Sequence, residues 1–316
     1  METIYFTQEN CNIRAEGEHL RLTRKGETLT NIPLTGVKTI VIFDSVSLSA
    51  KALDLLLVSG VDVLYISKWG KIKGRIISAK GGGAVLKLAQ HTAFIDSDRR
   101  LEIAKSIVDA KIRNQMAVIK KYKYHDTNPD FDAKLNEIKR FSKLLEDAEA
   151  IDEIMGIEGI SAKYYWDCFR HLLKKPIFIR REYRPSPDYV NALLNLGYSF
   201  LASEITTCLI AKNFDIEIGF LHSIHYGRNS LTLDIMEEFR SLFIDAWILS
   251  LFNKKQFKEE HFDINNGDYR LNDDGFRKFC GLFHERVPLW RDKFRTQSDK
   301  LKTALLKGEV YEPYYE

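Results

Sequence analysis

Acidic residues and histidines gather in two neighbouring segments of this 316-residue chain. Asp234 and Glu237 stand three residues apart in an amphipathic helical pattern, so their carboxylates project from one side of that helix. Just upstream, a loop rich in turn residues carries His222 and His225 toward the same helix start. Carboxylates with one imidazole suit Mg²⁺ or Mn²⁺. The segments predict a divalent-cation site, and a solvated acidic first turn with a structural histidine is the alternative.

A third acidic residue, Glu158, lies between Gly156 and Gly159, where we expect a helix to begin. Glycines in such a place let a backbone or a ligand approach closely. Ala162 and Tyr165 share a helical face with Glu158, which predicts space above the carboxylate and a phenol beside it. A capping glutamate with ordinary core packing is the alternative.

The first part of the chain consists of short β-type runs separated by turn residues, with one helix between the third and fourth runs. The expected helix covers residues 50–57 and is capped by Ser47 or Ser49, and we expect a hairpin turn at Trp69 and Gly70. The expected strands are residues 3–6, 20–23, 37–43, 63–67 and 72–77.

After three consecutive glycines, residues 81–83, the pattern changes to long helical periodicity. The sequence therefore predicts an α+β protein with a β-rich domain over residues 1–80 and a larger helical domain over residues 81–316. The expected helices are residues 97–122, 131–145, 148–173, 188–211, 230–252 and 274–283.

The composition is that of a globular protein, with 45% hydrophobic and 29% charged residues and a net charge of only +3. The four cysteines are far apart and form no CxxC pair, so we expect buried free thiols in a reducing cytoplasm. We find no signal-peptide pattern and expect no stretch apolar enough to span a membrane.

Three segments taken together resemble the CRISPR-associated integrase family of spacer acquisition. They read GIEGISAKYY, NALLNLGYSFLASEI and GFLHSIHYGRNSLTLDIMEEFR. The family pattern is a glutamate in an EG step before a small residue and a tyrosine, an asparagine-containing helix, and GxLH leading to an acidic helix. The resemblance covers nearly the whole chain and departs at residues 213–216, which read NFDI where the family often has a G-x-D-P turn.

The resemblance implies that Glu158, His222 and Glu237 are catalytic ligands of Mg²⁺ or Mn²⁺, with Asp234 and Tyr165 supporting them. It further implies that the 3′-hydroxyl of a short DNA fragment attacks a phosphodiester at the edge of a repeat, and that the chain also acts as an endonuclease. A nuclease that uses water and a DNA-binding scaffold without chemistry remain the alternatives.

The resemblance also implies partners. These are DNA, a second copy that joins through the β-rich domain, and a small ferredoxin-like subunit that bridges two such dimers. For phosphate contacts we favour Arg180, Arg181 and Arg184, because Tyr183 is interleaved with them, and Arg228, because its loop also carries the histidines.

Overall fold

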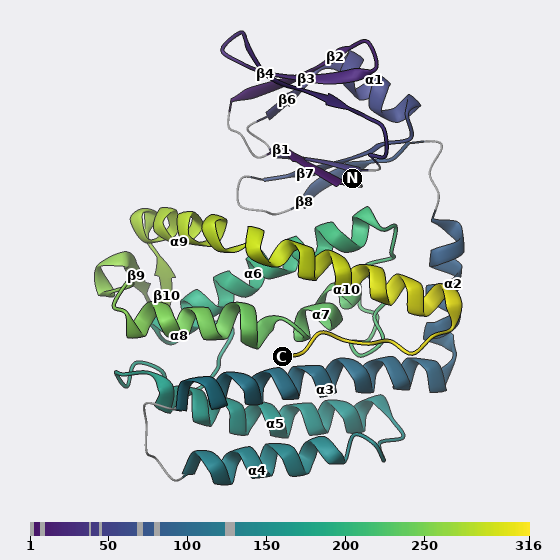
Figure 1. Cartoon of the computed structure of the whole chain (residues 1–316). Helices are drawn as coiled ribbons and strands as arrows, with labels where there is room; N and C mark the ends of the chain where they lie inside the picture. The colour runs from purple at the N-terminus through teal and green to yellow at the C-terminus, as the bar shows by residue number, and fades with distance from the viewer. Residues whose placement is uncertain are drawn as a thin grey trace.

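A small β-rich domain stands on a larger helical domain (Figure 1). The computed structural model describes residues 3–6, 10–37, 39–43, 46–67, 72–78, 83–123 and 130–316. The predicted α+β class is confirmed. The predicted domain boundary between residues 80 and 81 and the predicted turn at Trp69 and Gly70 lie outside the described residues.

Two four-stranded sheets face each other in the β-rich domain. The first has the order β1-β5-β7-β8, in which only β8 is antiparallel, and the second has the order β4-β3-β2-β6, in which β6 is parallel to β2. Their strands are β1 (Thr3–Phe6), β5 (Thr39–Phe43), β7 (Asp62–Ile66), β8 (Ile72–Ile76), β4 (Glu27–Pro33), β3 (His19–Arg24), β2 (Cys11–Glu16) and β6 (Val46–Leu48).

Helix α1 (Ala50–Val58) packs with the two sheets around a core that contains the fully buried Ile13, Ile40 and Leu56. Ser49 caps this helix, since its hydroxyl oxygen accepts the Ala52 N–H at 3.2 Å. The five predicted strands correspond to β1, β3, β5, β7 and β8, whereas β2, β4 and β6 were not predicted. Strand β4 is an edge strand whose side chains are almost all exposed, so it has no alternating pattern.

Helices dominate the second domain, and all six predicted helical segments are present. The segment predicted over residues 230–252 contains a π-helical turn, and two helices, α2 and α10, were not predicted. The elements are α2 (Ala84–Ile95), α3 (Ser97–Tyr122), α4 (Asp130–Lys143), α5 (Ile151–Leu172), α6 (Tyr189–Ala211), α7 (Ser230–Glu237), the π-turn η2 (Arg240–Asp245), α8 (Ala246–Asn253), the 3₁₀ turn η3 (Glu259–His261), β9 (Phe262–Asn265), β10 (Asp268–Leu271), α9 (Asp273–Arg286) and α10 (Pro288–Lys307).

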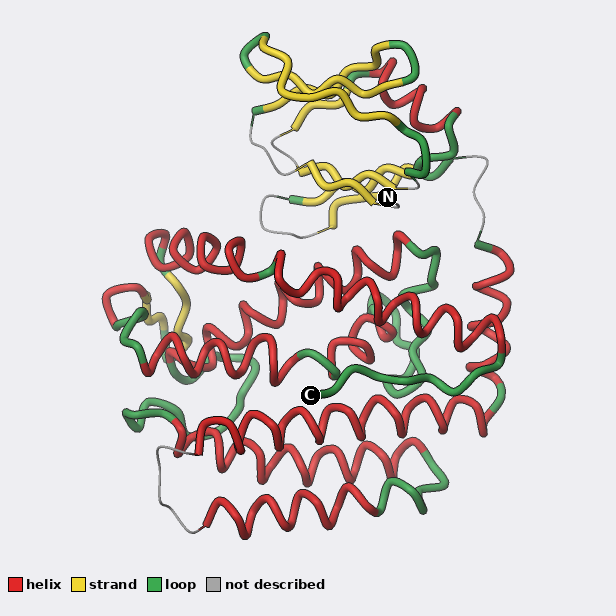
Figure 2. The backbone as a smooth tube through the Cα atoms, in the orientation of Figure 1, coloured by secondary structure: helices red, strands yellow, loops and turns green. Residues whose placement is uncertain are grey.

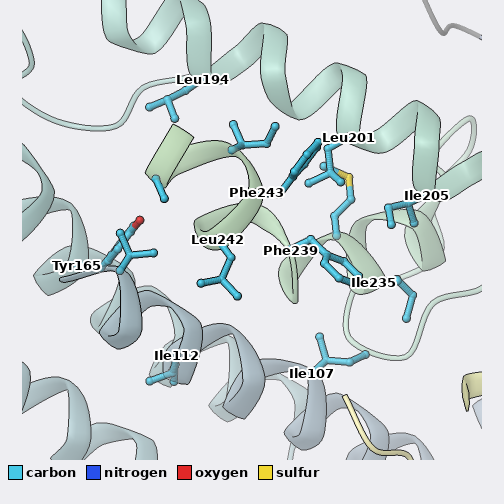
Figure 3. Close-up of a cluster of buried hydrophobic side chains, with 14 of the residues drawn as sticks. Ile107, Ile112, Tyr165, Leu194, Leu201, Ile205, Ile235, Phe239, Leu242 and Phe243 are labelled. Carbon is cyan, nitrogen blue, oxygen red and sulfur yellow. The ribbon is translucent and has the colours of Figure 1, made fainter. Parts of the chain in front are cut away.

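Helices α3, α4 and α5 form one layer, and α6, α7, α8 and α10 lie against it (Figure 2). Figure 3 shows Ile107 and Ile112 of α3 in the same buried cluster as Ile235 of α7 and Phe239. The apolar residues of α3 recur at helical spacing, which turns one stripe of the helix toward this core. The shared core fixes α3, α5 and α7 relative to one another.

Helix α6 is long and apolar enough to cross a membrane by length and composition, which corrects our expectation that no such stretch exists. Of its most apolar window, 61% is buried inside the protein, and Leu193, Leu201 and Leu209 are fully buried. The helix is apolar on nearly all sides because neighbouring helices surround it. All four cysteines are buried thiols, as predicted.

The β-rich domain contacts the C-terminal end of α6. Ile210 packs against a small cluster that contains Val41 and Leu64, and the Arg75 guanidinium donates to the Asn213 side chain at 2.5 Å. Asn213 opens the NFDI segment, so that departure from the family pattern lies at the contact between the domains.

We predict that Gly197→Ala destabilises the protein by about 1–3 kcal/mol. An added Cβ would lie 2.8 Å from Cγ2 of the buried Ile244, which has no room to move. Gly281→Ala is the control, because no atom lies within 4 Å of its Cβ position, and it gains about 1 kcal/mol from helix propensity. Urea unfolding measures both changes, and equal stabilisation by the two variants would contradict the packing argument.

Candidate active site

The carboxylate of Asp234 is fully buried and holds the loop that carries His222. It accepts the backbone N–H groups of Phe220, Leu221 and His222, the last two at 3.0 Å. Its Oδ1 also lies 2.7 Å from His222 Nδ1. A buried carboxylate needs such partners to replace its lost hydration. Both oxygens of Asp234 are therefore occupied by the loop, and Asp234 does not lie ready to share a cation with Glu237.

Gly219 lets the loop approach α7 closely enough for these bonds. A Cβ at this position would lie 2.6 Å from Asp234 Oδ2 and 2.8 Å from the carbonyl carbon of Ser230. Only glycine fits such a contact without displacing the backbone. Close packing of the loop against α7 therefore explains why the GFLH segment begins with a glycine.

Two side chains from outside the motif fix the same loop. The buried Gln90 of α2 donates to the carbonyl oxygens of Asp215 at 2.8 Å and Ile218 at 2.7 Å. Arg100 of α3 donates to the Phe220 carbonyl oxygen at 2.9 Å. The loop is therefore held from three helices, α2, α3 and α7.

His222 presents a defined tautomer because Asp234 accepts from its ring. An ionised carboxylate only accepts hydrogen bonds, so we assign the proton to Nδ1, which leaves the Nε2 lone pair free for a ligand role. The His222 side chain is 16% exposed. His225, the other candidate, is exposed and its Nδ1 lies 3.2 Å from the Tyr226 carbonyl oxygen.

Glu158 and Glu237 converge on one positive charge, the Lys111 ammonium of α3. Lys111 Nζ forms an ion pair with Glu158 Oε1 and lies 2.6 Å from Glu237 Oε2. The other oxygen of Glu237, Oε1, lies 3.2 Å from Arg240. Two carboxylates from different helices, α5 and α7, thus share a single cation in the interior.

Burial by itself would raise the pKa of Glu237, but Arg240 and Lys111 outweigh it and lower the pKa to about 2. His222 adds to this lowering of the pKa. Burial would lower the pKa of Lys111, and the two glutamates reverse that effect and raise it. Glu237 is therefore ionised at neutral pH.

We tested these residues against the divalent cation that the resemblance implies. Within the part of the chain that the structure describes, no three His, Cys, Asp or Glu side chains converge as a ready metal-binding group. Glu158 and Glu237 nevertheless already hold one shared cation, and Asp234 orients the His222 ring so that Nε2 keeps its lone pair. Hard oxygen donors with one imidazole fit Mg²⁺ or Mn²⁺. These donors fit a divalent cation if Lys111 moves away from the two glutamates and His222 moves closer to them.

Glu158 does not lie at a helix start, which corrects our expectation, since α5 begins seven residues earlier at Ile151. Gly156 and Gly159 are exposed inside the helix, and no protein atom lies within 4 Å of their Cβ positions. Protein packing therefore gives no reason for the two glycines. They leave a smooth, accessible helix surface beside Glu158.

The hydroxyl of Tyr165 is directed at Asp245 rather than at Glu158. It donates to Asp245 Oδ2 at 2.9 Å, and Tyr198 donates to Oδ1 at 2.5 Å. Burial raises the pKa of Asp245 to about 6, although both hydroxyls and the arginines 181 and 240 oppose this rise. Tyr165 thus binds the last residue of η2, and the expected phenol beside Glu158 is not found there.

The four predicted DNA-contact arginines differ in their surroundings. Arg181 lines a cavity of about 580 Å³ that Lys111, Glu158 and Arg240 also line. Its guanidinium bonds Asn195 at 2.5 Å and stacks over the Tyr198 ring at 5.2 Å. The other three lie nearer the surface: Arg180 is paired with Glu182, Arg184 lies over Tyr183, and Arg228 is half-buried.

The C-terminal residues are a packed segment that runs between α10 and α3 (Figure 1). Glu238, which follows Glu237, accepts the Tyr311 hydroxyl at 2.5 Å and the Tyr314 N–H at 2.7 Å. Asn114 of α3 donates to the carbonyl oxygens of Glu238 at 2.7 Å and Tyr314 at 2.9 Å. This segment therefore holds the end of α7 in place.

Comparison with known proteins decides the family. The family model described as "CRISPR associated protein Cas1" matches residues 4–285. The chain belongs to the Cas1 family.

The chain is 31% identical to "CRISPR-associated endonuclease Cas1 3" of Thermus thermophilus, over 98% of this chain and 96% of that protein. It is 32% identical to "CRISPR-associated endonuclease Cas1 1" of Archaeoglobus fulgidus, over 83% and 81%. Among solved structures, a casposase bound to integration product has a TM-score of 0.76 and 25% identity, over all of both chains. A chain of a partial Cas6-RT-Cas1--Cas2 complex has the same fold, with a TM-score of 0.82 at 20% identity, over 99% and 98%.

Several residues around this Cas1-family site were not found from the sequence. Lys111 and Asn114 lie in α3, far from the motifs, where a lysine or an asparagine is indistinguishable from an ordinary surface residue. Asp245 could have been found from the sequence, because it is an acidic residue in an otherwise apolar helical stretch that follows the acidic segment. Gln90 lies in a helix that was not predicted at all.

We predict that Asp245→Asn removes a pH dependence of stability. The raised pKa means that folding favours the neutral acid, so this stability is complete below the unfolded pKa of about 4 and is lost as pH rises through the folded pKa of about 6. Between these two pKa values, the free energy of unfolding of the wild type should fall by about 3 kcal/mol relative to that of the variant. Urea unfolding at a series of pH values measures it, and parallel profiles for the two proteins would contradict the assignment.

Proposed function

We propose that this chain is a metal-dependent DNA integrase of CRISPR adaptation that inserts short DNA fragments into a repeat array. The observation that carries the proposal is the pair Glu158 and Glu237, which share one cation, and the His222 imidazole that Asp234 orients supports it. Family membership and the likeness to a casposase bound to integration product support it.

In this proposal the 3′-hydroxyl of the incoming fragment attacks a phosphodiester of the repeat. A new P–O bond forms to that hydroxyl oxygen, the bond to the displaced 3′-oxygen breaks, and the hydroxyl proton ends on the displaced oxygen by way of solvent. Mg²⁺ or Mn²⁺ would polarise the phosphoryl oxygen and stabilise the charge on the displaced oxygen. No protein nucleophile is needed for this reaction, because the 3′-hydroxyl itself attacks the phosphorus.

The residues of the chain position the ligand atoms. Glu158 and Glu237 supply carboxylate oxygens, and Asp234 holds the His222 ring so that Nε2 keeps its lone pair. Arg240, 3.2 Å from Glu237, keeps that carboxylate ionised and adds positive charge to the cavity wall. Arg181 lines the same cavity and is placed to bind a DNA phosphate.

The second candidate function is hydrolysis of DNA, with water in place of the 3′-hydroxyl. The curated relatives carry the name endonuclease, and the same ligands would serve both reactions. We also propose the partners that the family resemblance implies, namely DNA, a second copy bound through the β-rich domain, and a small ferredoxin-like subunit that bridges two dimers. One structural neighbour is a chain of a partial Cas6-RT-Cas1--Cas2 complex, which supports association with a Cas2 subunit.

We predict that His222→Ala and Glu237→Ala each reduce strand transfer by at least about 100-fold, because each removes a ligand. The assay joins a labelled short duplex to a supercoiled plasmid with a repeat array, in the presence of the partner subunit and Mn²⁺. His225→Ala, in the same loop, is the matched control and should retain transfer. Transfer that survives in His222→Ala would reject this ligand set, while metal-dependent cutting without joining would favour the nuclease.

We predict that Gly159→Ala stabilises the chain by about 1 kcal/mol and yet weakens strand transfer. Alanine favours the helix, whereas its methyl group lies on the exposed helix surface next to Glu158, where we propose that the DNA backbone passes. Gly281→Ala in α9 is the control, with the same gain in stability and unchanged transfer. Unchanged transfer in Gly159→Ala would show that DNA does not approach this surface.

A further inference from the structure

Lys111 lies at the centre of the candidate site, although no motif of the sequence includes it. Its side chain is only 10% exposed, and its ammonium forms ion pairs with Glu158 and with Glu237, the latter at 2.6 Å. Both glutamates are the residues to which we assign the cation. The ammonium therefore stands where the charge of a shared cation would stand.

The surroundings explain why one positive charge is required there. Glu237 is 3% exposed and Glu158 is 25% exposed, so two carboxylates meet largely out of water. Arg240 contacts the other carboxylate oxygen of Glu237, at 3.2 Å. Lys111 contacts both carboxylates and therefore offsets the repulsion between them.

We propose that Lys111 is a built-in counter-ion whose ammonium occupies the binding position of the divalent cation and must move away when the cation binds. The inference rests on the proposed metal-dependent function. Lys111 thereby keeps the two glutamates paired in the metal-free protein and competes with the cation for them. It sets how tightly the chain binds its metal.

Competition follows from charge and space. An ammonium and a divalent cation that contact the same two carboxylates would lie within a few ångströms of each other and repel strongly. A like charge at about 4–6 Å changes an ionic equilibrium by about 10- to 1,000-fold. The lysine also has room to withdraw, because it lines the cavity of about 580 Å³ beside Glu158 and Arg240. There its charge faces the space that we assign to the DNA phosphate.

A second lysine in the chain makes the same kind of bridge away from the site and provides a matched control. Lys134 of α4 forms ion pairs with Asp130 and with Asp167 of α5, the latter at 2.5 Å, and its side chain is 13% exposed. This bridge joins α4 to α5. A purely structural lysine bridge should behave as Lys134 does.

The test compares wild type, Lys111→Met and Lys134→Met for Mn²⁺ binding, measured from the electron paramagnetic resonance signal of free Mn²⁺, and for thermal unfolding in EDTA and in Mn²⁺. Lys111→Met should bind Mn²⁺ at least about tenfold more tightly than wild type. It should also unfold at a lower temperature in EDTA and recover in Mn²⁺. Lys134→Met should lose stability without any change in Mn²⁺ affinity.

Each outcome decides the proposal. The proposed competition is overturned if Lys111→Met binds Mn²⁺ as tightly as wild type does, or more weakly. In that case, Mn²⁺ binding and strand transfer by the wild type would still support the metal-dependent function. If Lys111→Met folds only in Mn²⁺, the counter-ion role is supported, and Lys111→Gln then gives the affinity under milder loss of packing. Strand transfer by wild type in EDTA, with no Mn²⁺ bound by either protein, overturns both the inference and the proposed function.

Discussion

The buried carboxylate of Asp234 ties the loop of residues 219–222 to α7, and the geometry of the candidate site depends on this tie. Three backbone N–H groups and the His222 ring satisfy its charge, so loop and helix can only come together in one way. Glycine is required at position 219 because Asp234 Oδ2 lies 2.6 Å from the position that a Cβ would take there. One side chain thus sets the loop path, the histidine tautomer and the distance between loop and helix.

The interior around this tie holds more charge than a core needs for stability. Lys111 and Asp245 are buried and Arg240 is half-buried, and such charged groups stabilise a fold less than apolar residues of the same volume would. They are arranged so that each negative group has a positive or hydroxyl partner. The π-turn η2 carries Arg240 at one end and Asp245 at the other, and π-turns inside helices are frequent at functional sites.

Periodicity predicted most of the helical domain, because α3 to α6 bury one stripe or nearly all of their surface. It failed for strand β4, which is held by backbone bonds to β3 with its side chains in water. It also failed for α10, whose buried stripe has helical spacing but includes the polar Gln297 and Ser298. The position of Glu158 within α5 was also missed, since two glycines look like a helix start while the helix continues through them.

The sequence by itself determined the fold class, the helices with an apolar stripe, and the three residues to which the family resemblance assigns the metal, because these follow from local spacing and recognisable motifs. Only the tertiary structure decided what each charge meets. Lys111 and Glu158 are 47 positions apart and Tyr165 and Asp245 are 80 apart. Contacts over such separations arise from helix packing, and no local pattern encodes them. The cation that now neutralises the two glutamates therefore became visible only once α3, α5 and α7 were placed together.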